Sequence, residues 1–298
     1  MAISRQLSFY GMVSDESRLL SSLPTFRSVC YNSLVHSNDI PLLKHPLGAP
    51  SAFTADSLVA AVRSERKLPS EAVPPVCLLE FDGDLTDWMV TAGLAQVYKN
   101  WACFHTVMHT IEVDGTHCGI IPRTIGGPYA VLVAEQLKAS GVQVILGLTS
   151  AGRVGRSLPL PSLVIVEEAI RDEGTSYHYL PPSDSVHSNA ELVASLAGEM
   201  GFESLPVTLG RVWTTDAPYR ETQQQLDNYA ASGVVAVEMQ AASLFAFSKA
   251  KEIPVGVVAL VSNAVDHTED TFNKGSYDLG KRLIEAMCRS AIRYLKGS

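Results

Sequence analysis

The chain has 298 residues, of which 46% are apolar and 18% are charged. An apolar fraction of this size is enough to form a sizeable core and excludes a chain that is disordered throughout. Lys and Arg number 23 and Asp and Glu number 31, which gives a formal net charge of −8. This acidic balance argues against binding to nucleic acid or to an anionic membrane, because both need clustered cations. We therefore expect a globular protein of one or two domains.

The five cysteines are scattered along the chain, and no two of them form a CxxC pair. A disulfide framework or a zinc site would need closer spacing, so we expect reduced, mostly buried thiols and no metal ion. Residues 1–20 lack a basic segment followed by an apolar one, and no apolar run is long enough to span a membrane. The sequence thus predicts a cytoplasmic protein without a membrane segment.

Residues 1–74 contain short apolar stretches that are broken by Ser, Pro and Asn. One helix is predicted at residues 55–66, with Thr54 as its N-cap. Because Leu, Phe and Tyr recur through this part, we interpret it as an N-terminal extension that packs on the body of the protein or on a neighbouring subunit.

After this extension, short β-branched runs alternate with helical patterns. Strands are predicted at residues 74–81, 103–113, 116–122, 142–148, 160–170, 206–214, 234–239 and 255–262. Helices are predicted at residues 85–97, 129–139, 189–200, 219–231 and 241–251, and in a terminal segment that ends near residue 295. Asp114 and Gly115 suit a two-residue hairpin turn. The alternation predicts a mostly parallel sheet with helices on both faces, and ligands bind beyond the carboxyl ends of the strands in such sheets.

Five polar junctions follow predicted strands, at residues 124–128, 148–152, 169–179, 237–242 and 259–263. The glycines at 126 and 127 precede a helix and would let the backbone approach a ligand, although a tight connection that binds nothing fits equally well. Glu238 ends an apolar strand, and a buried carboxylate there needs hydrogen-bond partners.

In this order and spacing, the segments IGGP, GLTSAG, RDEGTSYHY, VEMQAA and VSN resemble the nucleoside phosphorylase superfamily, nearest its uridine phosphorylase branch. The resemblance covers residues 75–298 and implies a single-domain, three-layer α/β/α fold around a central mixed sheet. It further implies a homodimer or hexamer. It implies an enzyme of nucleoside metabolism that breaks the N-glycosidic bond with water or phosphate as the attacking group. No cofactor is implied, other than phosphate as a co-substrate.

The resemblance also implies roles for individual residues. Met239 would lie against the ribose, and Glu238 would stabilise the cationic sugar of the transition state. Gln240 stands where family members usually have a glutamate that holds ribose hydroxyls. Trp213 could stack on the base or could simply be a packed aromatic residue. The remaining residues for which the resemblance implies substrate contact are Gly83, Ser150, Arg171, His178, Thr215, Asp216 and Tyr219.

Asn263 occupies the position at which adenine-specific members of the family have a proton-donating aspartate. An asparagine can hydrogen-bond to a 6-oxopurine or a pyrimidine, so these bases are favoured, and Asp266 is an alternative acid close by.

The phosphate site of the resembling phosphorylases contains three arginines, and their positions correspond here to Asp87, to the neighbourhood of Phe104 and His105, and to Gly147. The hydrolytic members of the family have an acidic residue at the first of these positions, where it activates water. Asp87 therefore fits a general base, and hydrolysis is slightly favoured. Phosphorolysis remains open because Arg123 and Arg153 flank the glycine loops, and so does nucleoside binding without turnover.

Overall fold

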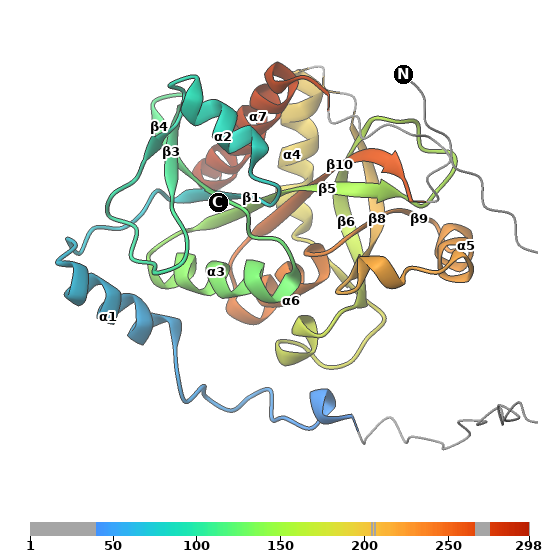
Figure 1. Ribbon diagram of the computed structural model, residues 1–298, viewed down its shortest axis with the longest axis horizontal. Helices are drawn as coiled ribbons and strands as arrows, with labels where there is room; N and C mark the ends of the chain where they lie inside the picture. The colour runs from blue at the N-terminus through green and yellow to red at the C-terminus, as the bar shows by residue number, and fades with distance from the viewer. Residues whose placement is uncertain (1–39, 204, 206, 266–274, 298) are drawn as a thin grey trace, which may run out of the picture. The chain divides into compact units, whose positions relative to one another are not determined.

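A mixed ten-stranded β-sheet lies at the centre of the part of the chain that the structure describes (Figure 1). The computed structural model describes residues 40–203, 205, 207–265 and 275–297. The strands are β1 (Val76–Glu80), β2 (Gln96–Val97), β3 (His109–Val113), β4 (Thr116–Pro122), β5 (Val144–Arg153), β6 (Ser162–Asp172), β7 (Ser185–His187), β8 (Val207–Thr215), β9 (Val234–Glu238) and β10 (Val255–Ala264). The helices are α1 (Ala55–Arg66), α2 (Asp84–Thr91), α3 (Gly127–Ala139), α4 (Ala190–Phe202), α5 (Gln223–Ala231), α6 (Ala241–Lys251) and α7 (Tyr277–Gly297). Short 3-10 helices are η2 (Pro41–Leu43), η3 (Thr175–His178) and η4 (Pro218–Arg220).

Strand β5 changes its neighbour along one edge. Its residues 144–148 pair in parallel with β1, whereas Gly152 and Arg153 pair with the antiparallel strand β9. Its other edge pairs with β10 from Ile145 to Arg153. Strand β10 pairs with β6, β6 with β8, β8 with β9 and β9 with β5, so β5, β10, β6, β8 and β9 form a closed ring of strands. An opening is therefore left beside residues 149–151, between the end of β1 and the end of β9.

Helices cover both faces of the sheet, so the expected three-layer α/β/α arrangement is confirmed (Figure 1). Leu79 of β1 belongs to a hydrophobic cluster that includes residues of α3 and α6, such as Phe245. Leu78, its neighbour in the strand, belongs to a second cluster that includes residues of α4 and α7, such as Leu196. This alternation follows from the two-residue period of a strand that is buried on both faces.

The sheet is mixed rather than mostly parallel, since β10 runs antiparallel to β6 and β9 runs antiparallel to β5. The predicted Asp114-Gly115 hairpin turn is confirmed, with φ angles of 48° and 73°.

Two helix predictions were too long. The helix predicted at residues 85–97 ends at Thr91, and Gly93 then adopts a φ of 72° that turns the chain toward β2. The helix predicted at 219–231 begins only at Gln223, where Thr222 and Gln225 form a capping box.

The described part of the predicted N-terminal extension contacts the rest of the fold. Helix α1 has the predicted bounds, and the Thr54 hydroxyl accepts a hydrogen bond from the Ser57 N–H at 3.2 Å, as expected of an N-cap. Val59 and Val62 of α1 form a small cluster with Ala102. Residues 1–39 of the extension lie outside the described residues.

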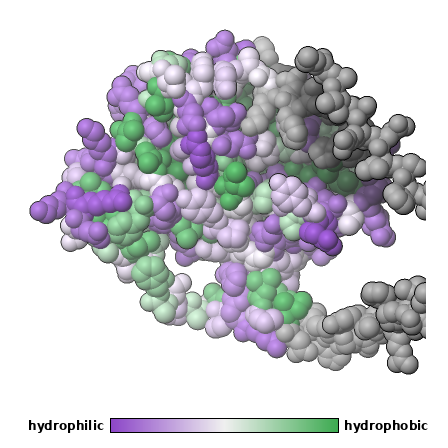
Figure 2. Space-filling view, viewed as in Figure 1, coloured by the Kyte–Doolittle hydropathy of each residue, from purple (hydrophilic) through white to green (hydrophobic). Residues whose placement is uncertain are grey.

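The surface is mixed in character. On the face shown in Figure 2, hydrophobic residues occupy small areas that are separated by hydrophilic ones. Among the described residues, no helix combines the length and the apolar character of a membrane span.

Gly147 of β5 lies where a larger side chain would meet its neighbours. A Cβ atom at residue 147 would lie 3.1 Å from the Phe81 ring and 3.2 Å from a methyl group of Val257. Phe81 is 1% exposed, and it lines the opening beside β5. The ring of Phe81 thus fills the space into which a longer side chain at 147 would project.

We expect Gly147→Ala to lower the free energy of unfolding by ~1–3 kcal/mol, because overpacking forces the Phe81 ring or Val257 to move. Urea unfolding would measure the change. Gly198→Ala is the matched control, since Gly198 lies in α4 with nothing within 4 Å of an added Cβ. This control should stabilise the protein by ~0.5–1 kcal/mol. An equal gain in both variants would contradict the packing described for Phe81.

Candidate active site

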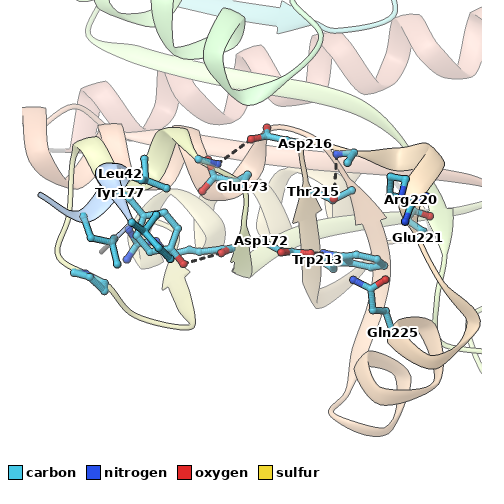
Figure 3. Close-up of a pocket in the computed structure, with 16 residues that line it drawn as sticks. Leu42, Asp172, Glu173, Tyr177, Trp213, Thr215, Asp216, Arg220, Glu221 and Gln225 are labelled. Atoms are coloured by element: carbon cyan, nitrogen blue, oxygen red, sulfur yellow. Dashed lines mark hydrogen bonds between the residues drawn. The ribbon is translucent and has the colours of Figure 1, made fainter. Parts of the chain in front are cut away.

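Two cavities lie at the carboxyl ends of the central strands. The first, which we call the β5–β9 cavity, has a volume of about 590 Å³ and occupies the opening between β1 and β9. The second, the β6–β8 cavity, has a volume of about 600 Å³ (Figure 3). Each is large enough for a nucleoside-sized molecule. The predicted site residues divide between them, which the sequence did not indicate.

The β5–β9 cavity brings together several of the predicted residues, namely Ser150, Tyr219, Glu238, Met239, Gln240 and Asn263. The β6–β8 cavity contains Arg171, Trp213, Thr215 and Asp216. Gly83, Asp87 and His178 line neither of these two cavities.

Glu238 is held at the N-terminus of α6. One of its oxygens accepts hydrogen bonds from the Gln240 N–H at 2.6 Å and the Ala241 N–H at 2.9 Å. The other accepts from the Thr214 hydroxyl at 2.5 Å. Burial raises the pKa of Glu238 to about 7, the charge of Glu173 adds to this shift, and the three hydrogen bonds oppose it. Glu238 is 4% exposed, and its raised pKa lets the charge of the carboxyl change near neutral pH.

Gln240 presents a donor to the cavity. Its side-chain oxygen accepts hydrogen bonds from the Thr149 hydroxyl at 3.1 Å and from the Met239 N–H at 3.2 Å. The amide oxygen thus faces donors of the protein itself, and the NH₂ group is left for a ligand. Met239 itself is half-buried in the cavity lining.

The loop between β1 and α2 supplies a carboxylate that the sequence reasoning missed. Asp82 accepts a hydrogen bond from the Ser150 hydroxyl at 3.0 Å and lines the β5–β9 cavity. Asp82 and Ser150 also line an adjoining smaller cavity of about 310 Å³, together with Glu80 and Asp84. The position of Asp82 two residues after an apolar strand was the available signal.

Gly83 has no access to a ligand in this arrangement. Its N–H donates to Glu80 at 2.8 Å. A Cβ atom at Gly83 would come within 2.6 Å of the Arg123 side chain, which covers the turn. The guanidinium of Arg123 forms an ion pair with Asp87, and both side chains are more than half exposed. Asp87 thus lies outside the cavities with an arginine as its partner.

Asn263 reaches the β5–β9 cavity because β10 contains an irregularity. The pairing of β10 with β5 shifts register between Val261 and Asn263, and such a bulge redirects the side chain that follows it. The side chain of Asn263 accepts from Ser262 at 3.2 Å and donates to the Ala264 carbonyl at 3.3 Å. Asp266, the alternative acid, lies outside the described residues.

The β6–β8 cavity is framed by residues that already have internal partners. Trp213 is 1% exposed and donates its indole N–H to Asp172 at 2.9 Å (Figure 3). Its ring packs on Tyr229 with ring centres 4.6 Å apart. It is a packed aromatic residue rather than an open stacking surface. Asp216 accepts from the Gly174 N–H at 2.8 Å, and the Thr215 hydroxyl accepts from the Ala217 N–H at 3.2 Å.

Arg171 and His178 also have structural partners. The guanidinium of Arg171 donates to the Ser176 and Ser183 hydroxyls, each at 2.8 Å, and to the carbonyls of Leu180 and Pro181. It thus holds the chain between η3 and β7 rather than pairing with Glu173. His178 stacks on His45 with ring centres 4.5 Å apart.

Glu221 was also missed by the sequence reasoning. It follows η4 and is the one residue common to the linings of the β5–β9 and β6–β8 cavities among the residues that the structure describes. Burial raises its pKa to about 7. The sequence analysis placed Glu221 inside the helix predicted at residues 219–231, whereas the helix begins only at Gln223, so its position between two cavities was not indicated.

The described residues contain no group of three or more His, Cys, Asp or Glu side chains that could hold a metal ion. The four cysteines in the described ranges are free and buried.

A family model described as the phosphorylase superfamily matches residues 90–296. The chain belongs to this superfamily. The match spans the sheet from β2 to β10 and includes every element that lines the two cavities except η2 and the β1–α2 loop.

Individual relatives are more distant. A guanosine phosphorylase of Halorubrum lacusprofundi is 26% identical over 148 residues, which are 50% of this chain and 61% of that protein. Uncharacterized protein R802 of Acanthamoeba polyphaga mimivirus is 27% identical over 147 residues, 49% of this chain and 57% of that protein. A DeoD-type purine nucleoside phosphorylase of Bacillus cereus is 23% identical over 197 residues, 64% of this chain and 84% of that protein. The chain thus matches about three fifths of the length of the first two relatives.

The titration of Glu238 should appear in the stability of this superfamily member. Its pKa of about 7 exceeds the ordinary value of 4.5, so the folded state binds a proton more tightly than the unfolded chain. The stabilisation that protonated Glu238 gives to the folded state is fully present below pH 4.5 and is lost as the pH rises through 7. Because glutamine does not titrate, Glu238→Gln should lack this loss. We therefore expect the free energy of unfolding of the variant, measured with urea, to rise relative to that of wild type between pH 5 and pH 8. Glu112→Gln on the exposed side of β3 is the control. A constant difference at all pH values would contradict the assigned pKa.

Proposed function

We propose that the protein cleaves the N-glycosidic bond of a nucleoside bound in the β5–β9 cavity. The observation that carries this proposal is the arrangement at the end of β9, where a buried carboxylate, a half-buried thioether and a buried amide follow one another as Glu238, Met239 and Gln240. Membership of the phosphorylase superfamily supports the same reaction class.

The sugar would lie over Met239. The NH₂ group of Gln240 would donate to a ribose hydroxyl, since the amide oxygen faces the Met239 N–H and the Thr149 hydroxyl. As the glycosidic bond lengthens, the sugar acquires oxocarbenium character, and the ionised carboxylate of Glu238 stabilises that positive charge. A carboxylate fixed by three hydrogen bonds does not have to reorient during the reaction.

The base would be a 6-oxopurine, with a pyrimidine as the alternative. Asn263 lines the cavity and can hydrogen-bond to a carbonyl of the base but cannot protonate a purine nitrogen as an acid would. The relatives named as guanosine and purine nucleoside phosphorylases favour the purine. Uridine, which the resemblance to the uridine phosphorylase branch suggests, is therefore only the alternative substrate.

Water is the acceptor that the charges of the cavity favour. The described residues that line the β5–β9 cavity include the acidic residues Asp82, Glu221 and Glu238 and no Lys or Arg. A phosphate dianion would meet like charge there, whereas a water molecule beside Asp82 and Ser150 would meet a general base and a hydroxyl group. Asp82 takes this role in the proposal, and Asp87 is the alternative base.

Phosphorolysis is the second candidate. Arg123 covers the Gly83 turn, close to the loop that carries Asp82, and its ion pair with Asp87 is exposed and therefore weak. Phosphate could compete for this guanidinium. The phosphorylase names of the relatives also favour this reaction.

Further parts of the proposal concern organisation. Residues 75–298 would form the nucleoside-binding domain, with residues 1–74 as an extension that packs on it or on a neighbouring subunit. The assembly would be a homodimer or hexamer in the cytoplasm.

A nucleoside panel separates the two reactions. Purified protein would be incubated with guanosine, inosine, adenosine and uridine, with and without phosphate, and the free base and the sugar product would be separated by chromatography. We expect base release from the 6-oxopurine nucleosides with free ribose as product in both conditions. If ribose-1-phosphate forms, and only when phosphate is present, hydrolysis is rejected. Saturable nucleoside binding without any product would reject the proposal that the protein is an enzyme.

Two isosteric variants separate the candidate bases. We expect Asp82→Asn to lower kcat for base release by ~100-fold or more, because a general base contributes at least about this factor. Asp87→Asn should change kcat by less than about fivefold, since an exposed ion pair contributes at most about 1 kcal/mol. A larger effect at residue 87 than at residue 82 would assign the base to Asp87 instead.

A further inference from the structure

Glu173 is a buried carboxylate to which the proposed reaction assigns no role. It directly follows β6, is 7% exposed and lies in the lining of the β6–β8 cavity (Figure 3). Its Oε2 atom accepts hydrogen bonds from the Ser243 hydroxyl at 2.5 Å and from the Ser176 N–H at 3.0 Å. Its Oε1 atom is buried and has no hydrogen-bond partner among the described residues. Burial of such a group is costly, so its position needs an explanation.

Glu173 and Glu238 both contact the first turn of α6. Glu238 accepts hydrogen bonds from the N–H groups of Gln240 and Ala241, and Glu173 accepts one from the Ser243 hydroxyl two residues later. Both glutamates are more than nine-tenths buried. Two carboxylates thus lie at one helix N-terminus inside the protein, where water screens their charges little. Each negative charge therefore makes the ionisation of the other less favourable.

The surroundings of Glu238 support this coupling. Besides burial, the charge of Glu173 is what raises the pKa of Glu238. Two other carboxylates, Asp82 and Glu221, line the same β5–β9 cavity. Arg153 of the adjacent strand β5 directs its guanidinium to a main-chain carbonyl. Glu173 is therefore the one charged group, among the described residues, that shifts the ionisation of Glu238.

The charge of Glu173 is not cancelled by its own neighbours. The guanidinium of Arg171 donates to hydroxyls and carbonyls of the segment between η3 and β7 and forms no ion pair with Glu173 among the described contacts. The other ionisable groups on the elements around Glu173 are Asp172, Tyr177 and Asp216, with Glu135 of α3 and Lys251 of α6, which pair with each other.

We propose that Glu173 is a positioning residue whose charge, held against the first turn of α6, determines how readily Glu238 releases its proton. This inference rests on the proposed function, in which the ionised form of Glu238 stabilises the cationic sugar. Glu173 does not contact the sugar in this arrangement and acts only through Glu238. Its charge keeps a fraction of Glu238 protonated at neutral pH, so bond cleavage should become faster as the pH rises.

The pH dependence of kcat tests this role. In wild type, kcat should rise as the pH increases through about 7, because Glu238 then loses its proton. Glu173→Gln removes the neighbouring charge and should move this rise to lower pH. At about pH 6, where roughly one tenth of Glu238 is ionised in wild type, the ratio of kcat to its plateau value at high pH should increase by at least about twofold.

Three further variants separate charge from packing. Glu173→Ala removes the charge without burying an amide, so it replaces Glu173→Gln if that variant does not fold, and it should move the rise in the same direction. Glu173→Asp retains a carboxylate and should stay closer to the wild-type profile than either neutral variant. Glu112→Gln is the control, because Glu112 is exposed on β3 and lines neither cavity. A fall in kcat by the same factor at every pH in both neutral variants would overturn the inference.

A spectroscopic titration tests the inference without turnover. The infrared band of the protonated Glu238 carboxyl is identified by its loss in Glu238→Gln. In Glu173→Gln this band should disappear at lower pH than in wild type, and an unchanged titration would overturn the inference. If wild-type protein releases no base from any nucleoside, the proposed function fails, whereas this titration still decides whether Glu173 controls Glu238.

Discussion

The site depends on the way in which β5 exchanges one neighbour for another. A strand has two edges, and β10 occupies one edge of β5 from Ile145 to Arg153. On the other edge β1 departs after Leu148 and β9 arrives at Gly152, so the backbone between them faces the cavity instead of a strand. The carboxyl ends of β1, β5 and β9 meet there, which is the position where sheets of this kind bind ligands. Glu238 then ends β9 and receives the first N–H groups of α6, so one carboxylate joins the strand, the helix and the cavity.

The exchange of β1 for β9 beside β5 also determines the electrostatics of the cavity. Glu238 is buried at a helix N-terminus, where the helix dipole favours its charge, while burial opposes it. Asp82 lies opposite, on the loop after β1, and is bound to the Ser150 hydroxyl. The described lining thus concentrates negative charge around the place where a sugar would become cationic. The same field is unfavourable for a phosphate dianion, so one distribution of charge favours one acceptor and disfavours the other.

Hydrophobic periodicity located most of the strands and helices, because each element buries a face whose spacing is readable in the sequence. The polar residue at the end of β9 was recognisable for the same reason, since Glu238 interrupts an apolar run. What periodicity could not provide was the orientation of groups within the site. The sequence left open whether Trp213 stacks on a base or packs internally, and its ring packs on Tyr229 while its indole N–H donates to Asp172. It also left open whether the glycines at 126 and 127 contact a ligand. A Cβ at Gly127 would lie 2.1 Å from the Ser243 hydroxyl oxygen, so this glycine allows α3 to approach α6.

Packing restricts the choice of side chain at residue 147. Phe81 fills the space beside Gly147 and also lines the cavity, so an arginine at 147 would require the ring to move. At the Gly83 turn a cation does remain, as Arg123, but it is paired with Asp87. A protein that retained phosphate as its acceptor would have to break this pair for each anion bound, whereas water requires no such exchange. This difference supports the proposal that water is the acceptor in this member of the phosphorylase superfamily.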